Sequence, residues 1–260
     1  MTPTCTTIVA LDDDHLPELA AVWPTWVKFR PEILQQPLLL MCDEYTAPGN
    51  LWWTQIADWW REQLQFVWQD HPKARIAFWG QPHVTPDGLP QRERALTALV
   101  FGTAHVRTPW YLKLDTDVVA TSPGKWIDDS WFAGNPVFVT SPWGYTKPAN
   151  AIQALDDWGD TTPGVREHPR LNLPFDPASR LVRHKRIISY VFFGRTDWTQ
   201  KMASLAGDRL PVPSQDTFLW YCAKRRGDMY RTRNMKTFGW RHINGLQRLR
   251  EAADRALSGA

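Results

Sequence analysis

Two carboxylates, Asp115 and Asp117, stand one residue apart at the end of an apolar run near the middle of the chain. In an extended strand over residues 110–114, Leu112 and Leu114 would share one face and anchor the strand in a sheet. The chain then leaves the sheet at Asp115, so both carboxylates can converge on one ion. Hard oxygen ligands suit Mg²⁺ or Mn²⁺, which keep open positions for water and substrate phosphates. The triplet alone also fits a solvated loop, and it is the preceding strand that favours a cation site.

A third carboxylate, Asp216, follows a Pro-Val-Pro-Ser-Gln segment at the start of a helix predicted over residues 215–224. With Ser214 as the N-cap, Asp216 would offset the helix dipole, an arrangement that stabilises a helix by less than about 1 kcal/mol. At the mouth of a parallel-sheet site, the same carboxylate could accept a proton from an attacking hydroxyl. The local sequence leaves both roles open.

His242 lies in a late segment that combines an imidazole with glycine and arginine side chains. A lone histidine is most often a satisfied surface or core residue. Here Gly245 permits close backbone approach, and Arg241 and Arg248 carry forked donors that suit phosphate oxygens. As a third cation ligand, His242 would favour Mn²⁺ over an all-oxygen Mg²⁺ site.

Strands and helices alternate along the first 120 residues. Apolar runs predict strands over residues 6–11, 37–42, 74–79 and 110–114, and helical spacing predicts helices over 15–29, 51–65 and 92–105. Pro24 is expected to kink or split the first helix. Three strands end in carboxylates, at Asp12, Asp43 and Asp115. This alternation predicts βαβ units, a mostly parallel central sheet flanked by helices, and a site at the carboxyl edge of the strands.

The pattern after residue 120 is less regular. It predicts strands over 136–140, 187–194 and 229–233 and helices over 197–206, 215–224 and 246–257. Residues 147–180 are rich in Pro, Gly and Asp, and we expect them to form a long excursion over the active face.

The composition describes a globular chain with two unusual features. Its 260 residues, 43% hydrophobic and 22% charged, suit one or two domains with a full core. Sixteen tryptophans stand out, and those within residues 126–160, together with Trp240, could shape pockets for the sugar and the acceptor. Residues 1–179 carry 13 Lys and Arg against 21 Asp and Glu, whereas residues 180–260 carry 17 against 6. The basic last third would suit an anionic partner such as nucleic acid, lipid headgroups or a nucleotide diphosphate.

The cysteines and the N-terminus bear on the cellular compartment. Cys5, Cys42 and Cys222 are widely spaced and form neither a disulfide framework nor a metal pair, so we predict reduced core thiols. Neither a signal peptide nor a run of 18 apolar residues is visible. We expect a cytoplasmic protein that can lie peripherally against the anionic inner face of the membrane.

Taken in order, these segments resemble a nucleotide-sugar-dependent glycosyltransferase of the GT-A fold. The resemblance spans about residues 1–250 and rests on Ile8-Val-Ala-Leu-Asp12, the strand ending at Asp43, Arg94-Ala-Leu, Leu114-Asp-Thr-Asp117, Gln215-Asp216 and His242. It implies one Rossmann-like α/β domain over residues 1–260. Within it, residues 1–120 would form the nucleotide-binding half, 121–245 the acceptor and metal half, and 246–260 a C-terminal helix.

The resemblance also implies a role for each residue. Nucleotide-sugar contacts would come from Asp12, Asp43, Arg94, Asp115 and Arg248. The metal ligands would be Asp115, Asp117 and His242, holding Mn²⁺ or Mg²⁺. Asp216 would be the catalytic base of an inverting enzyme. However, His242-Ile-Asn-Gly245 followed by Arg248 also resembles the ending of retaining members, so the stereochemistry stays open.

The implied activity is metal-dependent transfer of a sugar, of the hexosyltransferase kind, from a nucleoside-diphosphate sugar to a hydroxyl of a glycan or lipid-linked glycan. One alternative is a sugar-nucleotide pyrophosphorylase or nucleotidyltransferase, which should carry a Gly-rich basic loop after the first strand, where this chain has Asp12-Asp-Asp14. Another is a non-catalytic carbohydrate-binding or nucleic-acid-binding module, which gives no reason for three strands ending in acid. Nucleic acid is therefore not the expected partner. The sugar, the base, the acceptor and the oligomeric state are left open.

Overall fold

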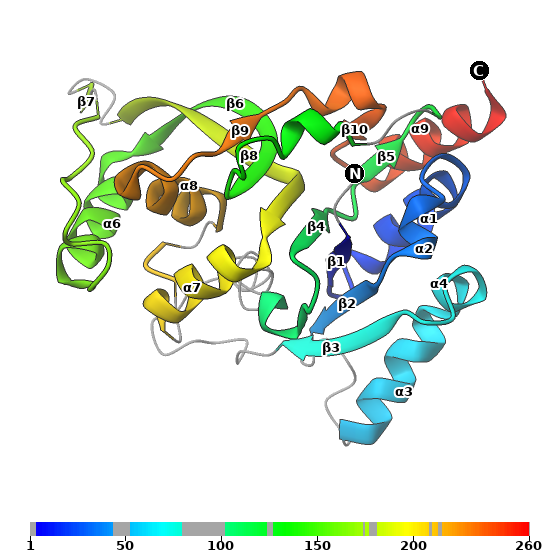
Figure 1. The fold of residues 1–260 in the computed structure, drawn as a ribbon. Helices are drawn as coiled ribbons and strands as arrows, with labels where there is room; N and C mark the ends of the chain where they lie inside the picture. The colour runs from blue at the N-terminus through cyan, green and yellow to red at the C-terminus, as the bar shows by residue number, and fades with distance from the viewer. Residues whose placement is uncertain are drawn as a thin grey trace.

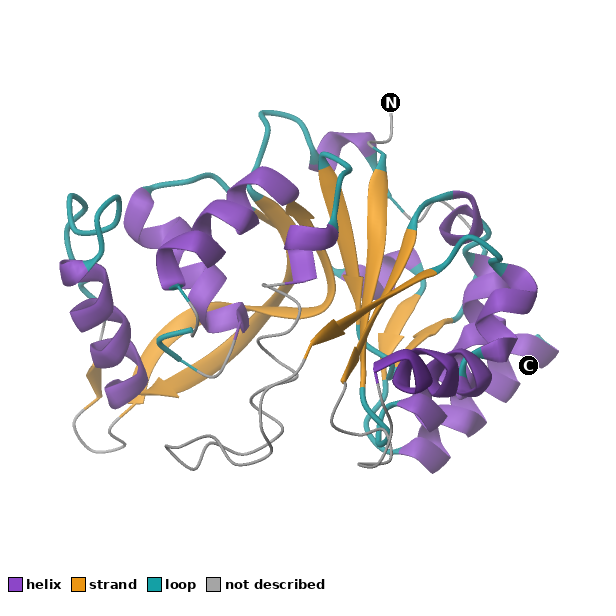
Figure 2. Ribbon diagram, turned by 90° about the horizontal axis from the view of Figure 1, so that it is seen from below, coloured by secondary structure: helices purple, strands orange, loops and turns teal. Residues whose placement is uncertain are grey.

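The computed structural model describes residues 4–43, 53–79, 102–123, 127–173, 175–176, 181–207, 210–212 and 215–259, with the backbone alone for 53, 143–150, 175–176 and 181–189. Within these ranges, helices lie on both sides of a central sheet (Figures 1 and 2). The strand order is β3-β2-β1-β4-β8-β6-β9, and β7 pairs with β8. Four of the seven strand pairs are parallel. The predicted α/β class with a mostly parallel sheet is confirmed.

The amino-terminal half of the sheet is parallel throughout. Its strands are Cys5–Leu11 (β1), Leu38–Asp43 (β2), Arg75–Trp79 (β3) and Trp110–Leu114 (β4). Every residue of β2 and β4 is buried, as expected for strands that are covered on both faces. The helical segments between these strands are Leu16–Phe29 (α1), Glu32–Gln35 (α2), Trp53–Gln63 (α3), Gln65–Asp70 (α4) and a 3₁₀ turn at Thr103–His105 (η1). Most of the helix predicted over 92–105 lies outside the described residues.

The second half of the sheet reverses direction. A long strand, Leu181–Arg195 (β8), runs antiparallel to both β4 and Phe138–Pro148 (β6). The short strand Arg231–Thr232 (β9) continues the sheet parallel to β6, and Phe175–Asp176 (β7) pairs with β8. The helices of this half are Ala149–Thr161 (α6), Thr196–Ala206 (α7) and Gln215–Arg226 (α8).

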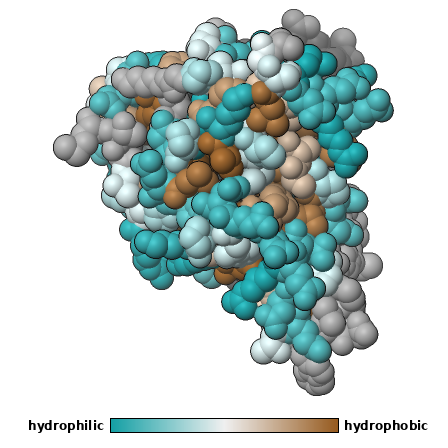
Figure 3. All heavy atoms as spheres, turned by 90° about the vertical axis from the view of Figure 1, so that its right-hand side faces the viewer, coloured by the Kyte–Doolittle hydropathy of each residue, from teal (hydrophilic) through white to brown (hydrophobic). Residues whose placement is uncertain are grey.

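A separate two-stranded ribbon lies beside the end of β4. It joins Val118–Ala120 (β5) antiparallel to Trp240–His242 (β10). Two 3₁₀ turns, Asp129–Trp131 (η2) and Met235–Phe238 (η3), accompany it in the chain, and Leu246–Ser258 (α9) follows β10. Helices α9 and α1 lie side by side (Figure 1). When the right-hand side of Figure 1 faces the viewer, the surface shows a mixture of hydrophilic and hydrophobic residues (Figure 3).

The core has two parts, divided by the sheet. Leu112 and Leu114 face the part that contains α1 and α9, whereas Tyr111 faces the part that contains α7 and α8. This alternation is the pleat predicted for residues 110–114. It means that side chains at odd and even positions of β4 meet different helices.

Two expectations about the chain path need correction. Pro24 does not split helix α1, because the buried face of this helix, including Val22 and Trp26, packs into the core and outweighs a cost of about 3 kcal/mol for an interior proline. Residues 147–180 are not one long excursion, since they contain α6. Ile152 and Leu155 bury the apolar face of α6, a local spacing that the Pro, Gly and Asp content of the whole segment concealed.

The tryptophans are mainly core residues. Trp131 and Trp240, which we expected to shape sugar pockets, are 1% and 0% exposed, so neither presents a platform. Among the described residues, Met229 is the one exposed large hydrophobic side chain. All three cysteines are free and buried, as predicted. In the part of the chain that the structure covers, no helix combines the length and apolarity needed to cross a bilayer.

Candidate active site

The strands that end in acid bring their carboxyl ends to one edge of the sheet. β1 pairs with β2 through Leu11 and Cys42, and with β4 through Ile8 and Lys113. The residues that follow or end these strands, Asp12, Asp43 and Asp115, are therefore neighbours at this edge. The edge is the place where parallel α/β sheets bind ligands.

Asp115 is held from within the strand that precedes it. Its Oδ1 forms an ion pair with Nζ of Lys113, whose side chain is only 4% exposed. Its backbone N–H donates to the carbonyl of Tyr190 in β8 at 3.0 Å. Burial raises the pKa of Asp115, Lys113 opposes this increase, and the nearby carboxylates of Asp117 and Asp216 add to it. Three carboxylates and one ammonium group therefore share a small region.

Asp117 meets His242 across the two-stranded ribbon. The register of β5 and β10 pairs Val118 with His242, and His242 Nε2 lies 2.8 Å from Asp117 Oδ2. The contact with Asp117 raises the pKa of His242, and burial opposes that increase. The carbonyl of Asp117 accepts a hydrogen bond from the backbone of Ile243 at 2.9 Å. Both the side chain and the main chain of Asp117 are thus fixed to the segment around β10.

The surrounding core locks this ribbon in place. The indole N–H of Trp26 in α1 donates to the carbonyl of Val118 at 2.7 Å. The ring of Tyr190 stacks on His242 with centroids 5.4 Å apart, and the Tyr190 hydroxyl lies 2.9 Å from the hydroxyl of Ser141. The His242 ring consequently has one orientation set by neighbours from two sheets.

Asp216 is the second residue of α8 and is 8% exposed. It lies near enough to the triplet for its charge to raise the pKa of Asp115. The structure therefore brings together four of the predicted residues: Asp115, Asp117, Asp216 and His242. A carboxylate placed here can accept a proton from a hydroxyl bound at the same edge.

Asp12 begins a second small network at this edge. Its Oδ1 accepts hydrogen bonds from the backbone N–H of His15 at 3.0 Å and from the His15 ring. Burial alone would raise the pKa of Asp12, but the bonds with His15 outweigh it and lower that pKa. The same pair raises the pKa of His15 to about 9. Glu18, one turn further along α1, accepts a hydrogen bond from the Thr116 hydroxyl at 2.7 Å and so connects this network to the triplet.

Three further nucleotide-sugar contacts were predicted, at Asp43, Arg248 and Arg94. Asp43 is fully buried at the end of β2. Arg248 is exposed in the first turn of α9. Arg94 lies outside the described residues.

The donor set at the ribbon fits a divalent cation by chemistry. Oδ1 of Asp117 is buried and has no hydrogen-bond partner among the described residues, so this oxygen is available to an ion. Two carboxylates and an imidazole are ligands that suit Mn²⁺. In the described part of the chain, no three His, Cys, Asp or Glu side chains already converge on a common point. Instead, Asp117 and His242 contact each other directly.

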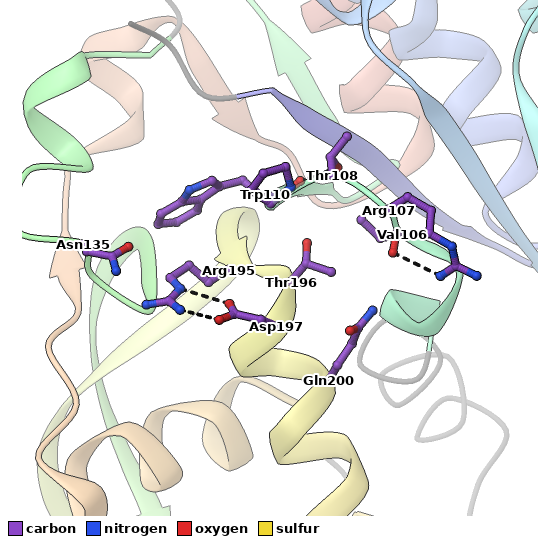
Figure 4. A pocket seen from close by; sticks show the side chains of 10 residues that line it. Val106, Arg107, Thr108, Trp110, Asn135, Arg195, Thr196, Asp197 and Gln200 are labelled. Atoms are coloured by element: carbon purple, nitrogen blue, oxygen red, sulfur yellow. Dashed lines mark hydrogen bonds and ion pairs between the residues drawn. The ribbon is translucent and has the colours of Figure 1, made fainter.

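A separate pocket lies at the opposite end of β4. It has a volume of about 570 Å³ and is lined by residues that include Trp110, Thr196 and Gln200 (Figure 4). Arg195 and Asp197 form an ion pair at its edge, so their charges offset each other. None of the predicted site residues lines this pocket.

Three residues of the site were not predicted from sequence. Lys113 had a detectable signal, because residues two apart in a strand share a face and Lys113 precedes Asp115 by two. His15 also had one, since it follows Asp12 at the spacing of one helical turn. Glu18 had none, because its contact with Thr116 joins segments far apart in the chain.

Comparisons with known proteins place this fold. No protein-family model matches the chain, and no curated protein sequence matches it. Solved structures do. The galactosyltransferase LgtC, in complex with donor and acceptor sugar analogs, superposes with a TM-score of 0.54 at 12% identity, over 96% of this chain and 95% of that one. The Mn/GDP form of core-mannan synthase A from Aspergillus fumigatus gives 0.51 at 11% identity, over 86% and 72%.

A structure with different chemistry is similar to the same degree. The 4-diphosphocytidyl-2C-methyl-D-erythritol synthase of Anaerococcus prevotii gives a TM-score of 0.51 at 10% identity, over 98% of this chain and 99% of that chain. At 10–12% identity, such likeness concerns the fold alone. These superpositions show that the chain has the GT-A fold of LgtC and core-mannan synthase A.

Proposed function

We propose that this protein is a metal-dependent glycosyltransferase that moves a sugar from a nucleoside-diphosphate sugar to a hydroxyl of a glycan or lipid-linked glycan. The observation that carries the proposal is the meeting of Asp117 with His242 at the carboxyl edge of a GT-A sheet. The neighbouring carboxylates Asp115 and Asp216 supply the other groups that such a reaction needs.

In this proposal, Asp117 and His242 hold Mn²⁺, or Mg²⁺, with Asp115 beside them. The cation, when bound, offsets the charge that develops on the departing diphosphate. Arg248 would contact the same diphosphate from α9. Asp12 and Asp43 would face the base and ribose, and residues 1–120 would form the nucleotide-binding half of the domain.

The acceptor side is assigned to residues 121–245, with 246–260 as the closing helix. In an inverting reaction, Asp216 would take the proton of the acceptor hydroxyl as the new glycosidic bond forms. Its place in the first turn of α8 suits this role, because the positive end of the helix dipole attracts a carboxylate. A retaining course remains compatible with the same residues.

The test is a thermal-shift screen with UDP-, GDP-, CMP- and dTDP-sugars, each with and without Mn²⁺. We expect one of the diphosphate-linked families, the UDP-, GDP- or dTDP-sugars, to raise the melting temperature only when Mn²⁺ is present, and the CMP-sugars, which carry a single phosphate, to leave it unchanged. If none does so, the transferase proposal fails. Incubation of the stabilising nucleotide sugar with a panel of glycan acceptors would then show whether transfer occurs.

A nucleotidyltransferase is the second candidate, favoured by the similarity to the diphosphocytidyl-methylerythritol synthase. Such an enzyme would consume a nucleoside triphosphate and release pyrophosphate. Against it, Asp12 is followed by acidic residues and not by a basic glycine-rich loop. Pyrophosphate release from a panel of NTPs with sugar phosphates distinguishes the two candidates.

The same proposal includes the location of the protein in the cell. Three free, buried cysteines suit a reducing compartment, and the basic last third suits the anionic face of a membrane. We expect co-sedimentation with vesicles that contain phosphatidylserine and weaker binding as salt is raised. Equal recovery with neutral phosphatidylcholine vesicles would count against a charge-based contact.

A further inference from the structure

Lys113 is a buried cation placed inside the acidic edge of the sheet. It is the fourth of the five residues of β4 and lies between Ile8 of β1 and Phe192 of β8. The residue is 3% exposed, which is rare for lysine unless a partner is present. Its partner is Asp115, through Nζ and Oδ1.

This ion pair limits what Asp115 can do. Nζ of Lys113 contacts Oδ1, while the side chain of Asp115 as a whole is 36% exposed. Among the described residues, this ion pair engages one oxygen of Asp115, and no ion pair engages the second oxygen, Oδ2. A lysine is a compact point charge without a flat fork, so it constrains one oxygen and leaves the other free.

Lys113 also sets the charge that an incoming cation meets. The carboxylates of Asp117 and Asp216 and the ammonium group of Lys113 act on Asp115. The imidazoles of His15 and His242 also lie close enough to interact with it. An ammonium group this close to a carboxylate ligand repels a divalent cation. Because Lys113 is buried, solvent screens this repulsion less than it would screen a surface charge. A bound diphosphate would bring negative charge that offsets the positive charge of Lys113, and the cation would then be repelled less.

We propose that Lys113 is a positioning residue that weakens the binding of a free divalent cation and so couples cation binding to the donor diphosphate. The proposal rests on the function proposed above. It assigns to Asp117 and His242 the direct hold on the cation, and to Asp115 the one oxygen that Lys113 does not engage. Free metal would then bind weakly, and metal with nucleotide diphosphate would bind strongly.

The test measures Mn²⁺ affinity by isothermal titration in wild type, Lys113→Met and Lys113→Arg, without nucleotide and then with saturating UDP or GDP. We expect Lys113→Met to bind Mn²⁺ alone about tenfold more tightly than wild type, since a nearby like charge has been removed. The gain in Mn²⁺ affinity on adding nucleotide should shrink in the same variant. Lys113→Arg keeps the charge, so its affinity for Mn²⁺ alone should stay below that of Lys113→Met.

The direction of the change in Mn²⁺ affinity distinguishes this role from a general disruption of the site. A disrupted site would bind Mn²⁺ more weakly, whereas the proposal requires tighter binding. Lys201→Met, an exposed lysine of α7, is the matched control and should change nothing. If Lys113→Met does not fold, Lys113→Gln keeps a polar contact to Asp115 without the charge and should give the same increase.

Three outcomes decide the matter. Equal or weaker Mn²⁺ binding in the folded variant overturns the role of Lys113 and leaves the transferase proposal standing. Tighter binding with unchanged coupling to nucleotide also overturns it. No Mn²⁺ binding by the wild type, with or without nucleotide, overturns the proposed function itself.

Discussion

His242 Nε2 lies 2.8 Å from Asp117 Oδ2, although more than a hundred residues separate the two in the chain. The antiparallel pairing of β5 with β10 creates this contact, and Trp26 of α1 donates a hydrogen bond to β5 at the carbonyl of Val118. The pair lies at the carboxyl edge of the sheet, where Asp115 and Asp216 also meet. It is the structural basis for the cation site that we propose.

Replacing Asp117 should remove that site. We expect Asp117→Asn to weaken Mn²⁺ binding by at least about a hundredfold, because even outer partners of metal ligands contribute tenfold to a hundredfold. Titration calorimetry with Mn²⁺ and the stabilising nucleotide measures this effect. Asp58→Asn, at an exposed carboxylate of α3, is the control and should bind as wild type. Unchanged Mn²⁺ affinity in Asp117→Asn would exclude Asp117 as a ligand.

Asp216 should matter for turnover and not for binding. In Asp216→Asn we expect nucleotide-sugar affinity within about twofold of wild type and turnover lower by about 10²–10⁴-fold, the usual contribution of general base catalysis. Steady-state kinetics combined with direct binding separates the two quantities. Asp254→Asn, exposed on α9, should leave both unchanged. Wild-type turnover in Asp216→Asn would remove Asp216 as the base.

The pair of Asp12 and His15 should make stability depend on pH. The pKa of His15 rises from 6.5 to about 9 in the folded state. Its contribution is therefore complete below pH 6.5 and is lost as the pH rises through 9. The His15 side chain is 44% exposed, so solvent screening limits this contribution to no more than about 1 kcal/mol.

Urea unfolding of wild type and His15→Ala at pH 6, 8 and 10 measures this dependence. The difference in unfolding free energy should be largest at pH 6 and small at pH 10. His105→Ala, at an exposed histidine of η1, should show no such trend. A difference that is constant across the three pH values would contradict the pairing.

Gly239 supports the turn that leads into β10. Its φ is 75°, and an added Cβ would lie 2.6 Å from Ser122 Oγ and 2.8 Å from Arg30 Nη2. The buried Arg30 guanidinium donates to the carbonyls of Ser122 and Phe238 at this turn. Gly239→Ala should therefore disturb both the backbone and this clamp.

Gly227→Ala separates those two effects, because Gly227 has a φ of 69° and nothing within 4 Å of its added Cβ. We expect Gly227→Ala to lower the unfolding free energy by about 1–2 kcal/mol, the cost of the left-handed conformation. Gly239→Ala should lower it by at least about 1 kcal/mol more, because packed atoms must shift. Equal losses in urea unfolding would show that the turn around Arg30 relaxes freely.

Much of the fold was predictable because its signals are local. The apolar runs at 6–11, 37–42 and 110–114 correspond to β1, β2 and β4 within one residue at each end. Helix α6 escaped prediction, because the composition of the surrounding segment obscured the burial of Ile152 and Leu155. The high tryptophan content suggested sugar platforms, but Trp131 and Trp240 fill the core. Composition counts residues and carries no information on which side of the backbone they face.

The βα alternation and the carboxylates at the ends of β1, β2 and β4 follow from the sequence alone, since periodicity and strand-terminal residues are properties of neighbouring positions. The sequence also places Lys113 two residues before Asp115, although it does not show that the two side chains pair. The contact of His242 with Asp117 and the charge that Asp216 adds to the same edge arise from tertiary packing. Those contacts depend on how β10 and α8 pack against the sheet. That packing is set by the burial of apolar side chains from the whole chain, which no local pattern specifies.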